Sequence, residues 1–452
     1  MDGPRTTALP VALALLLVLS PIAAVVHTGA GASTAARPAS DAGPSPSSDA
    51  PGARMTDAPG AGFPPVTGGR NTTAYLAIEA SDVQRSGRGT VSLDVAGAAA
   101  LDRAALEGRH SYLSLVESFT DAGTTAEREV AVERAIARLT DRVAALERRE
   151  RAALAAFNEG DMSARAYLRE LAVVNARADG LSRSLTQLYE YVDSMRESPV
   201  SPARIAELKS RLVGLRGPVR DRVAGAMRGG DDPVRVFVET SETAVVLATV
   251  TGSEFNRQYV REAYLPGVRD PGGTDRFRTD RGYDLEAART RASELYPWTF
   301  ENAGPTSTGL RTGEPYLYRA GVYSVTVDHP HGTAGQGDLV TYIDGATGDV
   351  FREVQFKDVS EVPTAEPLAN RSDGLYLAVN RTHPGGPVSV RVRSNATGDP
   401  VDATVSVDGE PVGRTGSDGR FWTVASREAF TVTATAGDRN VTVGPMLPAD
   451  TL

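Results

Sequence analysis

Few residues in this sequence have types and spacing that could support chemistry. The strongest candidates are His329 and His331, with Asp328 beside them and His383 elsewhere in the chain. Imidazole and carboxylate groups are ligands of zinc, so a metal-dependent hydrolase is one hypothesis. Stoichiometric metal in the dialysed protein would support it. We expect the histidine pair to lie in a solvated loop at the end of a strand, and we predict no metal site.

Two other segments do not have the residue patterns of the ligand-binding loops that they partly resemble. Residues 270–275 offer oxygen ligands but lack the acidic spacing and terminal glutamate of a calcium loop, so we expect a turn. Residues 332–337 are rich in glycine, but no lysine and no helix follow them, which excludes a phosphate-binding loop. The chain has no cysteine, which excludes thiol nucleophiles, disulfides and thiolate metal sites. The sequence therefore predicts a protein that is not an enzyme and has no cofactor.

The site residues that the sequence does predict are acceptors for N-linked glycans. Five asparagines begin an Asn-x-Ser/Thr motif, and four of them lie in the last 83 residues: Asn71, Asn370, Asn380, Asn395 and Asn440. This density indicates a C-terminal module that faces the outside of the cell.

The N-terminus has the layout of an export signal. An uncharged, mostly apolar run at residues 8–26 is followed by a small-x-small motif at 30–32, so residues 1–32 are interpreted as a signal peptide or an N-terminal anchor. There is no twin-arginine pair and no cysteine for lipid attachment. We expect export by the general secretory route to the outside of the cell or its surface, with membrane association if the leader is not cleaved. Residues 33–70, rich in Ala, Gly, Pro and Ser, are predicted to be a disordered linker.

The overall composition is that of a globular, multidomain protein. The chain has 452 residues, of which 41% are hydrophobic, and a net charge of −9, which argues against nucleic acid as a partner. Only Lys209 and Lys357 among the 48 basic residues are lysines. Adaptation to salt and a GC-rich coding sequence both explain this bias.

Residues 71–230 are predicted to form a mainly helical domain. After short strands at 75–79 and 90–95, a helix is expected over 98–119. Its predicted apolar face comprises Leu101, Leu106, Leu113, Val116 and Phe119.

A long antiparallel hairpin follows. Thr124 and Glu127 have the spacing of a capping box, and the apolar residues after them recur every three or four positions, with one interruption at Glu150. A break at 158–161 leads to Ser163, the expected N-cap of the second helix. Ser201 and Pro202 predict the start of a third helix.

The charge of this domain allows two interpretations. Residues 126–228 contain 19 basic and 15 acidic side chains, which favours a surface for an acidic partner or for anionic lipid headgroups. The alternative is a solvated helix face with intrahelical pairs such as Glu147 with Arg151. An unclosed face of the hairpin would also allow self-association.

Residues 231–360 are predicted to be an antiparallel sheet with a helix. Strands are expected at 234–238, 244–251, 258–264, 321–328, 338–344 and 350–356, and a helix capped by Asp284 precedes the last three. The helix, a Tyr-x-Val-x-Val type strand and the Tyr-Ile-Asp-Gly-Ala-Thr-Gly-Asp-Val hairpin of residues 342–350 resemble a PepSY domain over residues 283–359. An insert at 301–315 departs from that pattern. The resemblance implies a non-catalytic module that modulates an extracellular peptidase or binds an envelope protein.

Residues 361–452 have short strands separated by turns, which predicts a small β-sandwich. The segment 397–421, with Asp408-Gly409 and Asp418-Gly419 at its turns, resembles the carboxypeptidase regulatory-like, transthyretin-like fold. That resemblance implies a rigid spacer or an adhesion module.

The whole order of parts resembles uncharacterised exported proteins of halophilic archaea. The fold class that we predict is multidomain α+β: a helical hairpin or bundle, then a PepSY-like antiparallel sheet with a helix, then an all-β sandwich. The predicted function is non-enzymatic protein–protein interaction in the cell envelope, with another envelope or extracellular protein as partner. The alternative is a regulator or inhibitor of an extracellular peptidase.

Overall fold

A computed structural model describes most of the chain after residue 75. Its described ranges are residues 76–253, 256–280, 282–301, 308–310, 321–327 and 338–449. The predicted leader and linker, the glycosylation candidate Asn71, the histidines His329 and His331, and residues 332–337 lie outside these ranges.

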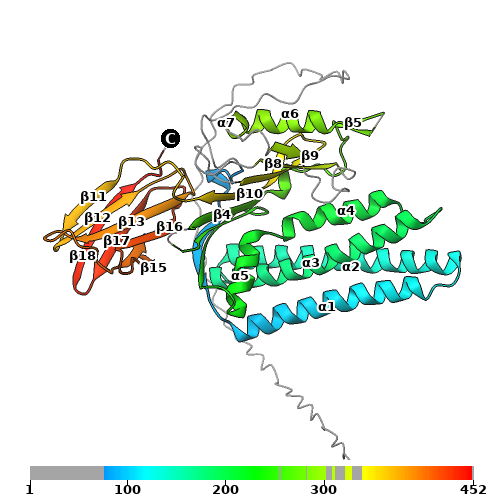
Figure 1. Cartoon of the computed structure of the whole chain (residues 1–452), viewed down its shortest axis with the longest axis horizontal. Coiled ribbons are helices and arrows are strands. Elements are labelled where there is room, and N and C mark those ends of the chain that lie inside the picture. Colours follow the sequence, from blue (N-terminus) through cyan, green and yellow to red (C-terminus); the bar gives the residue numbers. More distant parts are fainter. Residues whose placement is uncertain are drawn as a thin grey trace, which may run out of the picture. The chain divides into compact units, whose positions relative to one another are not determined.

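The described chain confirms the predicted fold class: a helical bundle, an antiparallel sheet with a helix, and a β-sandwich (Figure 1). The helices have these bounds: α1 Val95–Thr120, α2 Thr125–Glu159, α3 Ala164–Ser194, α4 Pro202–Leu212, α5 Pro218–Arg228, α6 Leu285–Leu295 and α7 Pro297–Glu301. Short 3-10 turns are η1 Ala80–Asp82, η2 Val213–Leu215 and η3 Pro266–Val268. Within these ranges, no helix has the length and apolar character needed to cross a membrane.

The predicted hairpin of α2 and α3 is confirmed, together with its caps. Thr124 and Glu127 form the reciprocal hydrogen bonds of a capping box. Gly160 ends α2 in the left-handed conformation with φ 90°, which favours glycine. Ser163 then caps α3, and Ser201 caps α4. The two long helices share an apolar seam because their buried residues recur at helical spacing.

The predicted apolar face of α1 is wrong in part. Leu106 and Leu113 are exposed, whereas Leu101 and the small residue Ala104 are buried against the neighbouring helices. The reason is a close crossing of α1 over α3, where a Cβ on Gly108 would lie 3.0 Å from the Cα of Gly180. This crossing places the small residues of α1 inside and turns its leucines outward.

The sheet has eight strands in the order β1-β2-β3-β4-β10-β9-β8-β7, all neighbours antiparallel. Their bounds are β1 Arg85–Val91, β2 Val234–Thr240, β3 Val245–Thr251, β4 Gln258–Tyr264, β7 Thr308–Leu310, β8 Val322–Val327, β9 Asp338–Asp344 and β10 Val350–Asp358. A separate two-stranded ribbon comprises β5 Arg278–Thr279 and β6 Gly282–Tyr283. In the strand expected at 75–79, the described residues 76–79 form no strand, but Leu76 and Ile78 are buried in the core between α6 and the sheet.

The two faces of the sheet have different partners because side chains alternate along a strand. Val236 and Val238 of β2 pack with α3 and α5 on one face. Phe237 between them faces the other way and joins Val424 of the sandwich. Further along this second face, the alanines of α6 pack on β8 and β9. The structure also contains helix α5, which was not expected from the sequence.

The C-terminal β-sandwich is made of two four-stranded sheets, β11-β12-β13-β16 and β15-β14-β17-β18. Their bounds are β11 Leu368–Ser372, β12 Leu375–Asn380, β13 Pro387–Ser394, β14 Thr404–Val407, β15 Glu410–Arg414, β16 Arg420–Val424, β17 Phe430–Ala436 and β18 Arg439–Met446. The strands β11 and β15 were not expected from the sequence. Both are edge strands whose residues are mostly exposed, so they lack an apolar alternation.

Candidate functional site

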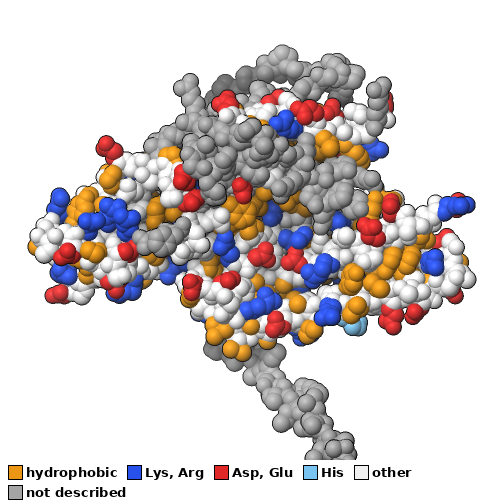
Figure 2. All heavy atoms as spheres, in the orientation of Figure 1, with side chains coloured by type: hydrophobic (Ala, Val, Ile, Leu, Met, Phe, Trp, Pro, Cys, Tyr) orange, Lys and Arg blue, Asp and Glu red, His pale blue; other side chains and the backbone are white. Residues whose placement is uncertain are grey.

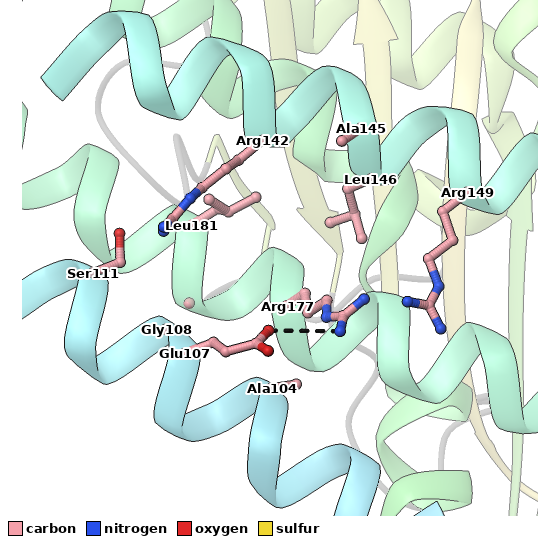
Figure 3. A pocket seen from close by; sticks show the side chains of 11 residues that line it. Ala104, Glu107, Gly108, Ser111, Arg142, Ala145, Leu146, Arg149, Arg177 and Leu181 are labelled. Carbon is pink, nitrogen blue, oxygen red and sulfur yellow. Dashed lines mark ion pairs between the residues drawn. The ribbon is translucent and has the colours of Figure 1, made fainter. Parts of the chain in front are cut away.

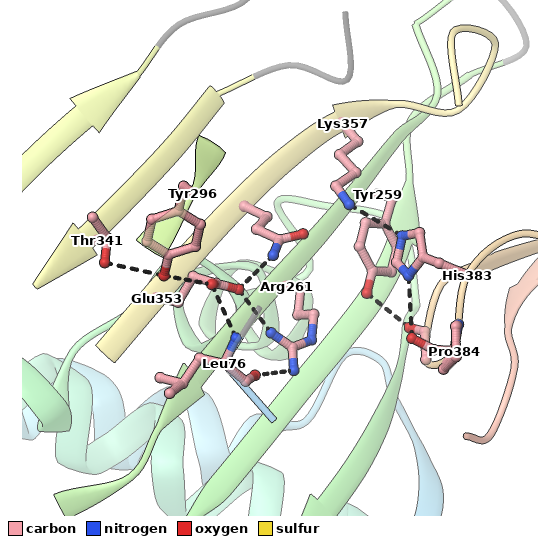
Figure 4. Close-up of polar contacts among 11 residues, drawn as sticks. Leu76, Tyr259, Arg261, Tyr296, Thr341, Glu353, Lys357, His383 and Pro384 are labelled. Carbon is pink, nitrogen blue, oxygen red and sulfur yellow. Dashed lines mark hydrogen bonds and ion pairs between the residues drawn. The ribbon is translucent and has the colours of Figure 1, made fainter. Parts of the chain in front are cut away.

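A buried carboxylate, Glu353 of β10, is the centre of a polar network on the second face of the sheet (Figure 4). Arg261 of β4 donates to it over 3.0 Å, Tyr296 over 2.9 Å, and the backbone N–H of Leu76 over 3.1 Å. Gln355 is a further donor. The second guanidinium nitrogen of Arg261 donates to the carbonyl of Leu76 over 2.6 Å.

This network is built for holding chain segments together. The Glu353 side chain is 0% exposed and that of Arg261 4%, so water and solutes do not reach the ion pair. Because both oxygens of Glu353 already accept hydrogen bonds, the carboxylate is not arranged to take a proton from a substrate. The network instead ties residue 76 and helix α6 to the sheet.

A second buried group lies where the sandwich meets the sheet. Lys357 of β10 lies 3.1 Å from Nε2 of His383, which precedes a turn of the sandwich (Figure 4). Nδ1 of His383 lies 3.1 Å from the carbonyl oxygen of Pro384, which can only accept a hydrogen bond, so Nδ1 carries the proton. Nε2 is then the acceptor, and Lys357 donates to it. Tyr259 donates to the carbonyl of Gly385 over 2.8 Å.

The electrostatics of this group follow from its burial. The pKa of His383 is well below its usual range, mainly because the ring is desolvated by burial and to a smaller extent because Lys357 lies beside it. Burial likewise lowers the pKa of Lys357 well below that of a solvated lysine. A lysine with a lowered pKa can act as a nucleophile or a base, but this one is buried between two packed sheets.

A third buried cluster joins the bundle to the sheet. Arg220 of α5 forms ion pairs with Glu150 of α2 at 2.8 Å and with Glu262 of β4 at 3.1 Å. Burial alone would lower the pKa of Arg220, but the two carboxylates raise it above its ordinary value. Burial raises the pKa of Glu262, and Arg220 opposes that rise. The interruption at Glu150 in the apolar repeat is therefore explained by a buried ion pair.

The bundle also holds a groove that is open to solvent. Its floor is α3 and its walls are α1 and α2, and its volume is about 420 Å³ (Figure 3). Arg142 and Arg149 project into it from α2, and Arg177 lies 3.5 Å from Glu107 of α1 across it. This is the described feature best suited to binding a small molecule.

The outer face of α1 carries exposed apolar side chains. Seven large hydrophobic residues are exposed in the described part of the chain, and five of them fall between residues 93 and 130. Val95, Leu106 and Leu113 are 78%, 67% and 52% exposed. Their spacings of eleven and seven residues place them on one line along the helix.

The structure places three glycosylation candidates at the surface of the sandwich. Asn370, Asn395 and Asn440 are exposed, whereas Asn380 at the end of β12 is half-buried. Asn395 begins the turn after β13. The amide nitrogen of Asn370 donates to the carbonyl of Thr442 over 2.8 Å, so a glycan there would have to displace that bond.

The other sequence candidates are not brought together as a site. Asp275 accepts from Tyr323 over 2.9 Å, and Asp344 caps the turn of the β9–β10 hairpin through the backbone N–H groups of Ala346 and Thr347. Among the residues that the structure describes, no three acidic or histidine side chains are grouped so that they could hold a metal ion. The expected intrahelical partner of Glu147 is also different: Glu147 pairs with Arg211 of α4 at 2.6 Å, which joins two helices.

Fold and sites together define a multidomain α+β protein whose last module is a sandwich of the fibronectin-III type. Residues 366–443 match the archaeal fibronectin-III type-like domain, and residues 236–363 match a family of unknown function, DUF7094. Residues 6–232, half of the chain, match the domain of unknown function DUF7096, and the chain belongs to that family. It is an archaeal protein, and neither PepSY nor a transthyretin-like module is assigned to it. No curated protein and no solved structure matches the chain.

Proposed function

We propose that this protein is an exported, non-enzymatic component of the archaeal cell envelope that binds another envelope protein through the outer face of α1. The observation that carries the proposal is the exposed apolar line of Val95, Leu106 and Leu113. Aligned apolar side chains on a helix are covered by a partner when the protein is assembled.

The remaining modules fit this role. The sandwich has the architecture of many cell-surface domains, and its exposed asparagines Asn395 and Asn440 are acceptor motifs for glycans. The apolar run at residues 8–26 supports export, with membrane anchoring if it stays uncleaved. Figure 2 shows hydrophobic side chains gathered over the helical bundle, among charged side chains of both signs.

The test is crosslinking of intact envelopes at native salt, followed by affinity recovery and mass spectrometry. The Leu106→Glu/Leu113→Glu variant should lose the recovered partner, because two buried charges would face it without counter-ions. Leu447→Glu is the matched control, since Leu447 is 60% exposed and does not belong to α1. Equal recovery by both variants would refute the proposal. Recovery of the same chain alone would identify the partner as a second copy.

A second candidate function is regulation of an extracellular peptidase. It is supported by the PepSY-like order of α6, β8 and the β9–β10 hairpin, whose turn at Asp344 to Gly348 has the glycine in the left-handed region with φ 74°. The purified full chain should then slow a secreted protease from the same cells. If no secreted protease is slowed, this candidate is removed.

The source is proposed to be a salt-adapted archaeon. The 57 acidic residues and the near absence of lysine support this proposal. The protein should then unfold when molar KCl is replaced by dilute buffer, because salt no longer screens the repulsion among carboxylates. Equal stability in both solutions would leave the coding bias as the explanation of the composition.

A further inference from the structure

The groove in the bundle has an apolar floor and a charged rim. Ala104, Leu146 and Leu181 line it together with the backbone at Gly108 and Gly180. A smaller cavity of about 110 Å³ shares Ser111 and Arg142 with it and extends it along α1 and α2. The two spaces are therefore neighbours along the bundle.

The groove exists because two helices approach α3 but separate from each other. The glycine crossing pulls α1 onto α3, and the buried leucines and valines of α2 do the same on the other side. The groove-lining residues of α1 and α2 include Ala104 and Ala145, whose side chains are too short to meet across the space. The gap is therefore a consequence of residue size at particular positions.

The charges around the groove are unequal. Arg142, Arg149 and Arg177 line it with a single carboxylate, Glu107. Arg149 is paired with Glu170 and Arg177 with Glu107, but within the described ranges Arg142 makes no ion pair. The Nε of Arg177 is buried without a hydrogen-bond acceptor. The site therefore has donors and positive charge to offer an anion.

The size of the groove fits a small molecule. Small-molecule sites have volumes of about 300–1,000 Å³ and apolar walls with a few placed polar groups. The groove, with a volume of about 420 Å³, matches this description.

We propose that this groove binds an amphiphile with a single apolar chain and a phosphate, sulfate or carboxylate head. The head lies between Arg142, Arg177 and the hydroxyl of Ser111, and the chain lies along Leu146 of α2 and Leu181 of α3. Guanidinium groups bind such heads through charge-assisted hydrogen bonds, and the floor removes the chain from water. The site goes beyond the protein contact proposed for α1, since Leu106 and Leu113 do not line it.

The probes are dodecyl phosphate and dodecyltrimethylammonium, titrated calorimetrically into the full chain below their micellar concentrations. Dodecyl phosphate should bind, and Arg142→Glu should weaken its binding about 10-fold or more because a charge-assisted contact becomes a repulsion. Ala145→Leu should weaken it similarly by filling the groove. The matched controls are Arg148→Glu and Ala155→Leu, exposed residues of the same helix that do not line the groove, and they should leave affinity within about twofold.

The outcomes are separable. Equal binding of both detergents, or binding unchanged by Arg142→Glu and Ala145→Leu, would overturn the site. Loss of binding in Leu106→Glu/Leu113→Glu alone would also overturn it, because the probe would then lie on the outer face of α1. Groove-dependent binding to vesicles that contain anionic phospholipid would identify the membrane as the source of the head. Groove-dependent binding of dodecyl phosphate without vesicle binding would identify a dissolved amphiphile.

Discussion

Replacing Arg261 by methionine should destabilise the protein strongly. The substitution keeps a long apolar stem on β4 but removes the cation that faces Glu353. Glu353 is fully buried, so its carboxylate would keep only Tyr296, Gln355 and the backbone of Leu76 as partners. The carbonyl of Leu76 would also lose its donor.

The magnitude follows from burial. Removing one partner of a buried ion pair costs about 3–5 kcal/mol, because the remaining charge stays in a medium of low polarity. The exposed pair of Arg103 and Glu107 has nearly the same separation, 2.9 Å against 3.0 Å, but its side chains are 78% and 47% exposed. Arg103→Met should therefore change stability by less than about 0.5 kcal/mol.

The assay is urea-induced unfolding at constant, native salt, followed by circular dichroism and by tryptophan fluorescence. Urea is preferred since it is uncharged and does not itself screen ion pairs. The double variant Arg261→Met/Glu353→Leu should regain part of the loss, because the carboxylate that had lost its cation is removed as well. If Arg261→Met and Arg103→Met have equal effects, the reasoning that burial strengthens the first pair is refuted.

Three further predictions concern single residues. His383→Gln should reduce the loss of stability on acidification, whereas His110→Gln should not. The folded state favours the neutral imidazole of His383, so its contribution to stability is present above about pH 6.5 and is lost below that pH at about 1.4 kcal/mol per pH unit. Unfolding titrations at several pH values measure this loss. Thr124→Ala should lower the free energy of unfolding by about 1 kcal/mol through loss of the capping box, as measured by urea unfolding. No change would mean that the N-terminal end of α2 is frayed. Gly180→Ala should destabilise the protein by about 1–3 kcal/mol, although alanine has the higher helix propensity, because the new Cβ would lie 2.9 Å from the Cα of Gly108. A rise in melting temperature would contradict this contact.

The sequence was sufficient for the features that depend on local chemistry. Caps at Thr124, Ser163 and Ser201 and the strands β2, β3 and β4 follow from neighbouring residues, and all were predicted. Long helices with regular apolar spacing were equally accessible, since the spacing alone selects which face is buried.

Features that depend on distant partners were not accessible. The outward direction of Leu106 results from a glycine contact between α1 and α3, which no spacing within α1 reveals. The buried partners Arg261 and Glu353 are separated by 92 positions, and no pattern within either strand indicates that they are buried or that they meet. The groove likewise depends on three helices at once, so the sequence predicted only the excess of basic side chains in residues 126–228 and not the groove.

The position of β1 has a consequence for the order of events during synthesis. Arg235 of β2 pairs with Thr90 of β1 and lies 145 positions after it, so the whole bundle is made between a strand and its neighbour. At a synthesis rate of about 5–20 residues per second, β1 exists without its partner for roughly 7–30 s. The helices can form in microseconds to milliseconds, and β1 then lies against α3 and exposes a bare edge. In this interval the nascent chain is most prone to pair the free edge of β1 with a strand of another chain. Correct folding therefore requires that β2 is synthesised before such pairing occurs.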